Sequence, residues 1–111
     1  MVMKFIPIAK PILIGQEKKY IEQCIKTGWI SSQGEFVTKF EREFARYRGV
    51  KYGVANANGT TALHLALAAL GIGPGHEVIA PDLTFISPVN AIIYTGAEPV
   101  LVDADRETWN I

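Results

Sequence analysis

The residues best suited to chemistry lie in the segment 55–70, ANANGTTALHLALAAL, where a short apolar stretch leads through a turn into an Ala/Leu-rich helix. Gly59 has no side chain, so an anion could approach the main chain at this point. The unpaired amides of the first helical turn and the helix dipole would face that anion, with the hydroxyls of Thr60 and Thr61 as further donors. The pattern predicts a phosphate-binding turn, although Asn58 and Gly59 also suit an ordinary tight connection.

Two further loops carry polar or aromatic residues after predicted strands. Ligands of parallel α/β sheets bind at the carboxyl ends of the strands, which is where the loops after residues 77–80 and 99–102 lie. Phe85 could stack on a heteroaromatic ring or pack onto the sheet, and the pattern alone does not decide between the two. A phosphate-binding turn beside an aromatic ring would suit a flat, phosphorylated cofactor. Asp103 and Asp105 are better explained as caps of the next turn than as paired catalytic carboxylates.

Other candidate sites are weaker. His64 and His76 have no second ligand at a metal-binding spacing, so no metal site is predicted. The run GIGPG at 71–75 follows a predicted helix and precedes a strand, the reverse of the order that a dinucleotide-binding loop requires. Cys24, the single cysteine, is interpreted as a small packed hydrophobe within a helix. No catalytic residue is predicted in the chain.

The composition is that of a small globular domain of 111 residues. Eleven basic and eleven acidic residues cancel, which argues against nucleic acid and against an acidic membrane as partners. At 49% hydrophobic and 20% charged the chain is too apolar for disorder, and its sequence has no apolar run long enough to span a membrane. The single cysteine and the lack of a signal-peptide pattern favour the cytoplasm.

The spacing of apolar residues predicts the elements that position these groups. The region 1–50 is expected to be a helical N-terminal arm, with Gly28 and Gly49 closing its two helices. In the region 51–111 strands and helices alternate, which predicts an α/β fold whose sheet is mainly parallel, with helices on both faces. The expected helices are 16–27, 35–48, 60–70 and 84–94, and the expected strands are 52–57, 77–80 and 99–102.

Two features indicate part of a larger unit. The last predicted strand runs into the polar segment 103–111, which is typical of a turn leading into a further element. A three-stranded parallel sheet would also leave an edge that natural proteins cover or pair. We therefore expect a fragment, with a C-terminal remainder absent, or a part that needs a partner.

Seven segments, in order, resemble the pyridoxal-phosphate-dependent sugar aminotransferases of the DegT/DnrJ/StrS group, within fold type I. They are IPIAKP (6–11), GWISSQG (28–34), FEREFA (40–45), ANGTTALHLAL (57–67), GPGHEVIAP (73–81), LTF (83–85) and PVLVDAD (99–105). The specificity of the match comes from the combination and the order of the segments. The resemblance implies that residues 1–111 are the N-terminal segment of the large, cofactor-binding domain of this fold.

The resemblance also implies roles for individual residues. Gly59 and Thr60 would bind the phosphate of pyridoxal 5′-phosphate, and the ring of Phe85 would lie over the pyridine. The residues near the mouth of the active site, which would line the nucleotide-sugar pocket, are Trp29, Ser31 and Ser32. Members of the family hold the cofactor as a Schiff base on a lysine and pair its ring nitrogen with an aspartate. None of the lysines in this chain lies in that sequence context.

The implied function is transfer of an amino group from a donor such as glutamate to a keto sugar attached to a nucleotide, by a homodimer or with a partner. The chain alone is expected to be inactive, because it lacks the family's lysine. One alternative is a truncated or split chain that acts as an assembly or binding module through its first two helices. A third reading, another fold type I enzyme that acts on amino acids, is disfavoured by the segment 28–34.

Overall fold

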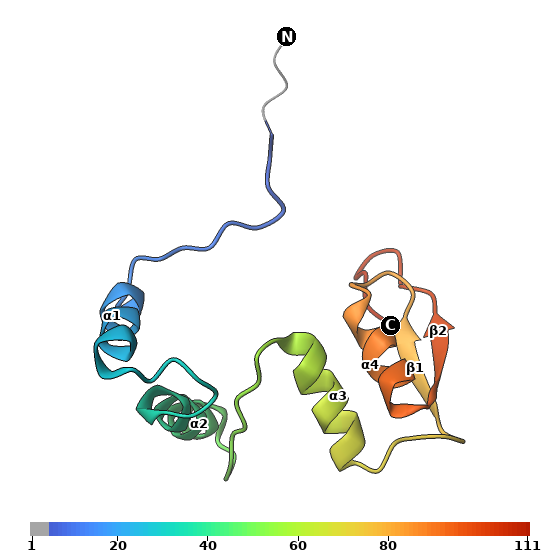
Figure 1. The fold of residues 1–111 in the computed structure, drawn as a ribbon. Helices are drawn as coiled ribbons and strands as arrows, with labels where there is room; N and C mark the ends of the chain where they lie inside the picture. Colours follow the sequence, from blue (N-terminus) through green and yellow to red (C-terminus); the bar gives the residue numbers. More distant parts are fainter. Residues whose placement is uncertain (1–4) are drawn as a thin grey trace. The chain divides into compact units, whose positions relative to one another are not determined.

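The structure is a computed structural model that describes residues 5–111, and it divides after Gly53 into two compact units. The first unit contains helices α1 (Glu17–Thr27) and α2 (Glu35–Arg48). The second unit contains α3 (Gly59–Ala69), β1 (Glu77–Pro81), α4 (Ser87–Thr95) and β2 (Glu98–Val102), as labelled in Figure 1. None of the helices in the described residues combines the length and the apolar character needed to cross a bilayer.

The helices of the first unit end as the sequence predicts. Gly28 closes α1 and Gly49 closes α2, both with left-handed backbone at φ 77° and 69°. Glu17 and Glu35 place an acidic side chain in the first turn of each helix, and basic residues lie in each last turn. This arrangement of charges complements the dipole of each helix.

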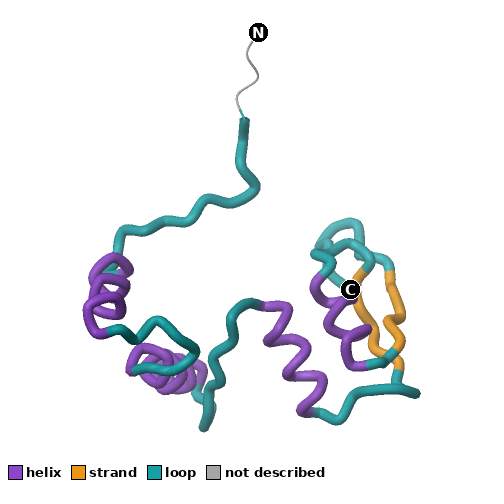
Figure 2. The backbone as a smooth tube through the Cα atoms, in the orientation of Figure 1, coloured by secondary structure: helices purple, strands orange, loops and turns teal. Residues whose placement is uncertain are grey.

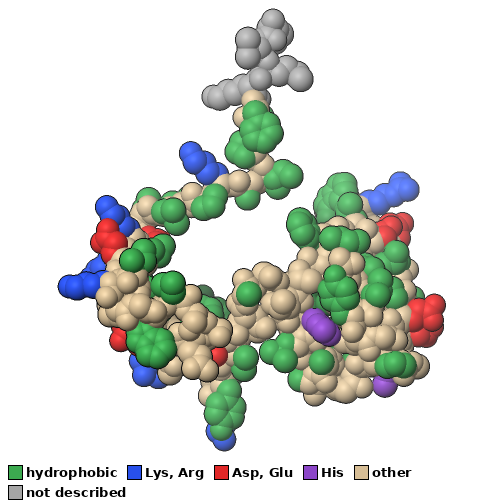
Figure 3. All heavy atoms as spheres, in the orientation of Figure 1, with side chains coloured by type: hydrophobic (Ala, Val, Ile, Leu, Met, Phe, Trp, Pro, Cys, Tyr) green, Lys and Arg blue, Asp and Glu red, His purple; other side chains and the backbone are tan. Residues whose placement is uncertain are grey.

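Aromatic residues join the two helices and continue along α2. The rings of Tyr20 on α1 and Phe36 on α2 lie 4.9 Å apart, and those of Phe40 and Phe44 stack at 5.5 Å. About half of the surface of Phe40 and Phe44 stays exposed, at 54% and 50%. The aromatic face predicted for α2 is therefore formed, and part of it is free of intramolecular cover within the described residues. Figure 3 shows hydrophobic side chains on the surface of both units and along the N-terminal segment.

The second unit is built around a parallel pair of strands. Glu77 lies opposite Glu98, and Pro81 lies opposite Val102. Helix α4 connects the strands and contacts both, so β1, α4 and β2 form a βαβ crossover, which Figure 2 traces along the backbone. Helix α3 packs against α4. The α/β class and the parallel sheet predicted from the sequence are thus confirmed.

Small and aliphatic side chains fill the core of this unit. Ala80 of β1, Ile92 of α4 and Ala97 are buried together. Val78 packs against this cluster, whereas Ile79, between Val78 and Ala80, is 63% exposed. Alternation of this kind is typical of a strand with one covered face. The packing of α4 against this face holds the βαβ crossover in place. It thereby positions the loops that follow β1 and β2.

The predicted strand 52–57 is not formed. Among residues 5–111, β1 and β2 are the only strands, and they pair with each other alone. A segment becomes a strand only when a neighbour accepts and donates its ladder hydrogen bonds. Because no neighbouring strand is present for residues 52–57, this apolar stretch is irregular.

Helix α4 begins at Ser87 and not at Thr84 as predicted. A helix that started at Thr84 would need a backbone amide at residue 88, where proline has none. In the structure Pro88 lies in the first turn, where the missing amide costs nothing, and the amide of Asn90 donates to the carbonyl of Ile86 at 3.0 Å. The segment 83–85 is consequently a loop.

Candidate anion-binding site

Asn58 caps the N-terminus of α3. Its side-chain Oδ1 accepts a hydrogen bond from the backbone amide of Thr61 at 3.0 Å, and the Thr61 hydroxyl accepts one from the amide of Asn58 at 3.4 Å. This reciprocal pair is a capping box. Asn58 and Gly59 therefore form a helix cap and not the tight turn that the sequence suggested, since Asn58 is extended and Gly59 is the first helical residue.

The first turn of α3 has backbone donors that the helix itself does not satisfy. The capping box uses the amide of Thr61, whereas the amides of Gly59 and Thr60 are first-turn donors for which the helix itself supplies no acceptor. A Cβ placed on Gly59 would find nothing within 4 Å. No acidic residue lies in this first turn, in contrast to α1 and α2. These are the properties of a helix end that receives an anion.

A hydrogen bond between side chains links this turn to α4. The hydroxyls of Thr60 and Ser87 are hydrogen-bonded to each other across 2.8 Å, in a half-buried position. Thr60 is the second residue of α3 and Ser87 is the first residue of α4. The N-terminal ends of two packed helices consequently meet at this pair of hydroxyls.

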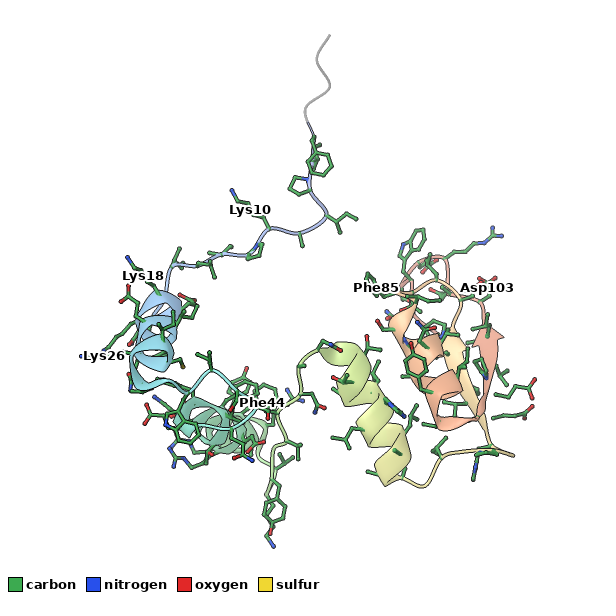
Figure 4. The ribbon with its side chains drawn as sticks, in the orientation of Figure 1. Lys10, Lys18, Lys26, Phe44, Phe85 and Asp103 are labelled. Atoms are coloured by element: carbon green, nitrogen blue, oxygen red, sulfur yellow. The ribbon has the colours of Figure 1, made fainter. Side chains whose placement is uncertain are left out.

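Phe85 lies in the loop between β1 and α4, two positions before Ser87 in the sequence. Its side chain is 79% exposed, so the alternative in which the ring packs onto the sheet is wrong. Figure 4 shows Phe85 and Asp103 at the same end of the second unit, where the loops after β1 and β2 lie. An exposed aromatic ring is thus available at the carboxyl edge of the sheet.

Asp105 caps the turn that follows β2, as predicted. Asp105 accepts hydrogen bonds from the backbone amide and the hydroxyl of Thr108, at 2.8 and 3.0 Å, and from the amide of Glu107 at 3.0 Å. These bonds, led by those of Thr108, hold the pKa of the Asp105 carboxyl below its usual range. Asp103 accepts from the amide of Ala104 at 2.9 Å. Both carboxylates are therefore engaged in shaping the loop.

Trp29, Ser31 and Ser32 lie in the first unit, in the loop between α1 and α2. Trp29 packs beside Gly34, where an added Cβ would stand 3.4 Å from the Cβ of Trp29. Trp29 and Ser32 line a shallow open hollow, and Ser31 accepts a hydrogen bond from the amide of Gln33 at 3.4 Å. The structure therefore brings Thr60 together with the start of α4, and it groups the three loop residues separately in the first unit.

The two histidines have structural contacts. The ring of His64 on α3 meets the ring of Tyr94 on α4 edge-on, with centroids 5.8 Å apart. Nδ1 of His76 lies 3.1 Å from the carbonyl oxygen of Gly73 within a turn. Within residues 5–111, no three His, Cys, Asp or Glu side chains are placed to hold a metal ion together.

Ser87 is the site residue that sequence reasoning missed. The predicted helix 84–94 made Ser87 its fourth residue, whereas in the structure it is the first. The dipeptide Ser87-Pro88 is itself a helix-start signal, because proline is favoured in the first turn. Reading that signal would have placed a hydroxyl at the end of α4, although its contact with Thr60 depends on helix packing.

Solved structures share this arrangement of elements. An aminotransferase from Psychrobacter cryohalolentis matches 89% of this chain and 26% of its own, at 36% identity and TM-score 0.78. A 3-amino-5-hydroxybenzoic acid synthase matches 93% of this chain and 27% of its own, at 41% identity and TM-score 0.80. The E. coli GDP-4-keto-6-deoxy-D-mannose-3-dehydratase, solved with bound hydrated PLP, matches 95% and 28%, at 30% identity and TM-score 0.82. The fold is that of an α/β domain of fold type I.

The family follows from the sequence of that domain. The chain belongs to the DegT/DnrJ/EryC1/StrS aminotransferase family, whose model matches residues 11–111. The GDP-perosamine synthase of E. coli O157:H7 is 54% identical over 109 residues, which are 98% of this chain and 30% of that protein. The GDP-perosamine synthase of Caulobacter vibrioides is 56% identical over 106 residues, which are 96% and 29%. The chain thus spans about 30% of the length of these relatives, and the family resemblance read from the sequence is confirmed.

Proposed function

We propose that this chain supplies the phosphate-binding part of an aminotransferase that uses pyridoxal 5′-phosphate and acts on a nucleotide-linked keto sugar. The observation that carries the proposal is the end of α3, where the capping box uses the amide of Thr61 and the helix supplies no acceptor for the first-turn amides of Gly59 and Thr60. That helix end lies inside the segment matched by the family model.

The residues at this end suit each part of the cofactor. The amides of Gly59 and Thr60 and the Thr60 hydroxyl donate to the phosphate, which the α3 dipole also favours. The ring of Phe85, which is exposed, would pack against the pyridine and exclude water from it. When bound, the cofactor supplies the electron sink that amino transfer requires. The role of these three residues is to bind and orient it.

The nucleotide of the substrate is proposed to be GDP. Two of the relatives that match nearly the whole chain are GDP-perosamine synthases, and one structural neighbour is a dehydratase of a GDP-linked keto sugar. Trp29, Ser31 and Ser32 are proposed to contact the nucleotide sugar. Glutamate is proposed as the amino donor and a homodimer as the working form.

The chain by itself is proposed to be inactive. The lysines labelled in Figure 4, Lys10, Lys18 and Lys26, are exposed side chains of the first unit, outside the sequence context of the cofactor lysine. After incubation with pyridoxal phosphate and gel filtration, the 111-residue chain should keep no yellow absorbance. A band that survives filtration and disappears on borohydride reduction would show that a lysine here holds the cofactor.

A chimera tests the proposed function directly. The matched N-terminal residues of the E. coli GDP-perosamine synthase are replaced by this chain, which is 54% identical to them. The chimera should retain pyridoxal phosphate and convert a GDP-linked keto sugar and glutamate into the GDP-linked amino sugar, detected by mass spectrometry. A folded chimera that releases pyridoxal phosphate on dialysis, while the unmodified synthase keeps it, would contradict the proposal.

A second candidate function, as an assembly module, is favoured by the exposed rings of α2. Phe40 and Phe44 stack on each other and remain about half exposed. A surface of this kind is typical of a protein contact. Sedimentation of the chain with and without Phe44→Glu tests this function, which predicts a self-associating or partner-binding wild type and a monomeric variant.

A further inference from the structure

The hydroxyl pair between α3 and α4 places a residue of α4 at the proposed phosphate site. The oxygens of Thr60 and Ser87 are 2.8 Å apart and half-buried, and each belongs to the first turn of its helix. The two helices pack along each other, so the pair is held by the fold and not by flexible loops. Ser87 is therefore fixed one hydrogen bond away from a residue that is proposed to bind phosphate.

The hydroxyl protons of Thr60 and Ser87 explain why this contact matters. Each hydroxyl has one proton to donate and two lone pairs that accept. Either of the two hydroxyls can be the donor of this 2.8 Å bond. When Thr60 is the donor, it has only lone pairs to present to its surroundings. A phosphate accepts hydrogen bonds, so Thr60 has to turn its proton toward the phosphate when the phosphate binds.

The two hydroxyls can provide a donor for the phosphate without the movement of any heavy atom. If Ser87 rotates its proton toward Oγ1 of Thr60, the Thr60 proton becomes free for the phosphate. The pair then forms a short chain in which Ser87 donates to Thr60 and Thr60 donates to the phosphate, and each bond polarises the next. No proton is transferred in this change, because both hydroxyls only rotate.

We propose that Ser87 is a positioning residue for the phosphate site. Its hydroxyl holds the Thr60 side chain in place, and it donates a hydrogen bond to Thr60 when Thr60 donates its own proton to the phosphate. The proposal rests on the proposed function. The proposal is supported by the lack of negative side chains where the two helix ends meet, since neither α3 nor α4 has an acidic residue in its first turn. Ile86, the N-cap residue of α4, makes no side-chain cap, so no side chain at that position competes with an anion for the first-turn donors.

The test compares three variants of the 111-residue chain, Ser87→Ala, Ser87→Thr and Thr95→Ala. The probe is pyridoxine 5′-phosphate, which has no aldehyde to react with lysines, and its binding is followed by NMR at the amides of Gly59 and Thr60. Pyridoxine without phosphate is titrated in parallel. Thr95 is the matched control, because its half-buried hydroxyl also lies on α4, at the other end, and donates to the carbonyl of Ile92 at 2.7 Å.

Ser87→Ala should weaken binding of pyridoxine 5′-phosphate by about threefold to tenfold, the effect of losing one supporting hydrogen bond. Ser87→Thr, which keeps the hydroxyl, should bind within about twofold of the wild type. Thr95→Ala should lower the unfolding midpoint without changing the affinity for the phosphate. Binding of pyridoxine should be the same in all four proteins.

The outcomes separate this inference from the proposed function. If the wild-type chain shows no shift at Gly59 and Thr60, the phosphate site is wrong and the role of Ser87 falls with it. If the wild type binds there and Ser87→Ala binds equally well, the site stands and only the role of Ser87 is overturned. Equal losses in Ser87→Ala and Thr95→Ala would also overturn it, since the effect would then come from stability alone.

Discussion

Pro74 packs so closely against the backbone of Gly96 that a Cβ on Gly96 would stand 3.0 Å from Cγ and 3.2 Å from Cδ of the ring. Gly96 closes α4 with left-handed backbone at φ 82°, and its amide donates to the carbonyl of Ile93 at 2.9 Å. The loop before β1 and the end of α4 are thus joined at a position where backbone angle and space both require glycine.

Replacing Gly96 by alanine should destabilise the second unit more than the same change at Gly71. Both residues have left-handed backbone, which costs alanine roughly 1–2 kcal/mol. A Cβ on Gly71 meets nothing within 4 Å, whereas one on Gly96 also pushes against Pro74. Urea unfolding followed by circular dichroism measures the difference, and equal losses in the two variants would show that Pro74 yields without cost.

Asn58→Ala should lower the free energy of unfolding by about 1 kcal/mol, the usual cost of losing an N-cap. Its side chain is the acceptor for the Thr61 amide, and alanine leaves that amide without a partner. Asn58→Asp should retain the cap. The matched control is Asn56→Ala, which removes an exposed amide that donates only to the nearby carbonyl of Val54 and should change stability little. A loss as large in the control would argue against the capping explanation.

Gly59→Ala should separate folding from anion binding. The added Cβ projects into open space, so the free energy of unfolding should stay within about 0.5 kcal/mol of the wild type. At the proposed site the phosphate approaches the main chain at Gly59, where a methyl group would obstruct it, so the affinity for pyridoxine 5′-phosphate should fall by about tenfold. Calorimetry measures the free energy of unfolding, and NMR titration measures the affinity. A variant that binds as the wild type does would place the phosphate elsewhere.

The Asp105 carboxylate should make stability depend on pH in the acid range. Hydrogen bonds from Thr108 and Glu107 favour its charged form and lower its pKa in the folded state below the reference value of 3.8. Its contribution is therefore present above pH 3.8 and is lost as the pH falls through the folded-state pKa. The wild type should exceed Asp105→Asn in stability near neutral pH, and the difference should shrink in acid. A difference that is constant with pH would refute this assignment.

Local signals allowed most of the fold to be predicted, and contacts between distant residues account for the errors. Gly28 and Gly49 end their helices as expected because a left-handed residue stops a helix wherever it occurs. The predicted strand 52–57 failed because a strand depends on a partner that its own sequence does not contain. The late start of α4 is a local signal, because Pro88 favours a helix that begins just before it, and the predicted start at Thr84 was three residues too early.

The candidate site shows the same difference between local patterns and contacts between distant residues. Gly59 and Thr60 were found because a helix start after an apolar stretch is a local pattern. The exposure of Phe85 depends on which side chains pack over β1, and the contact between Thr60 and Ser87 depends on the packing of α3 against α4. Neither could be derived from spacing along the chain.

The parallel pairing of β1 and β2 has a consequence for how the chain folds during synthesis. Parallel strands cannot be joined by a tight turn, so β1 cannot pair with β2 until α4 and all of β2 have left the ribosome. The helices α1 and α2 depend on nearby residues and can form well before that point. For the time it takes to translate the crossover, the apolar strand around Ile79 is an unpaired edge, and it is the segment at which a chaperone would be expected to bind.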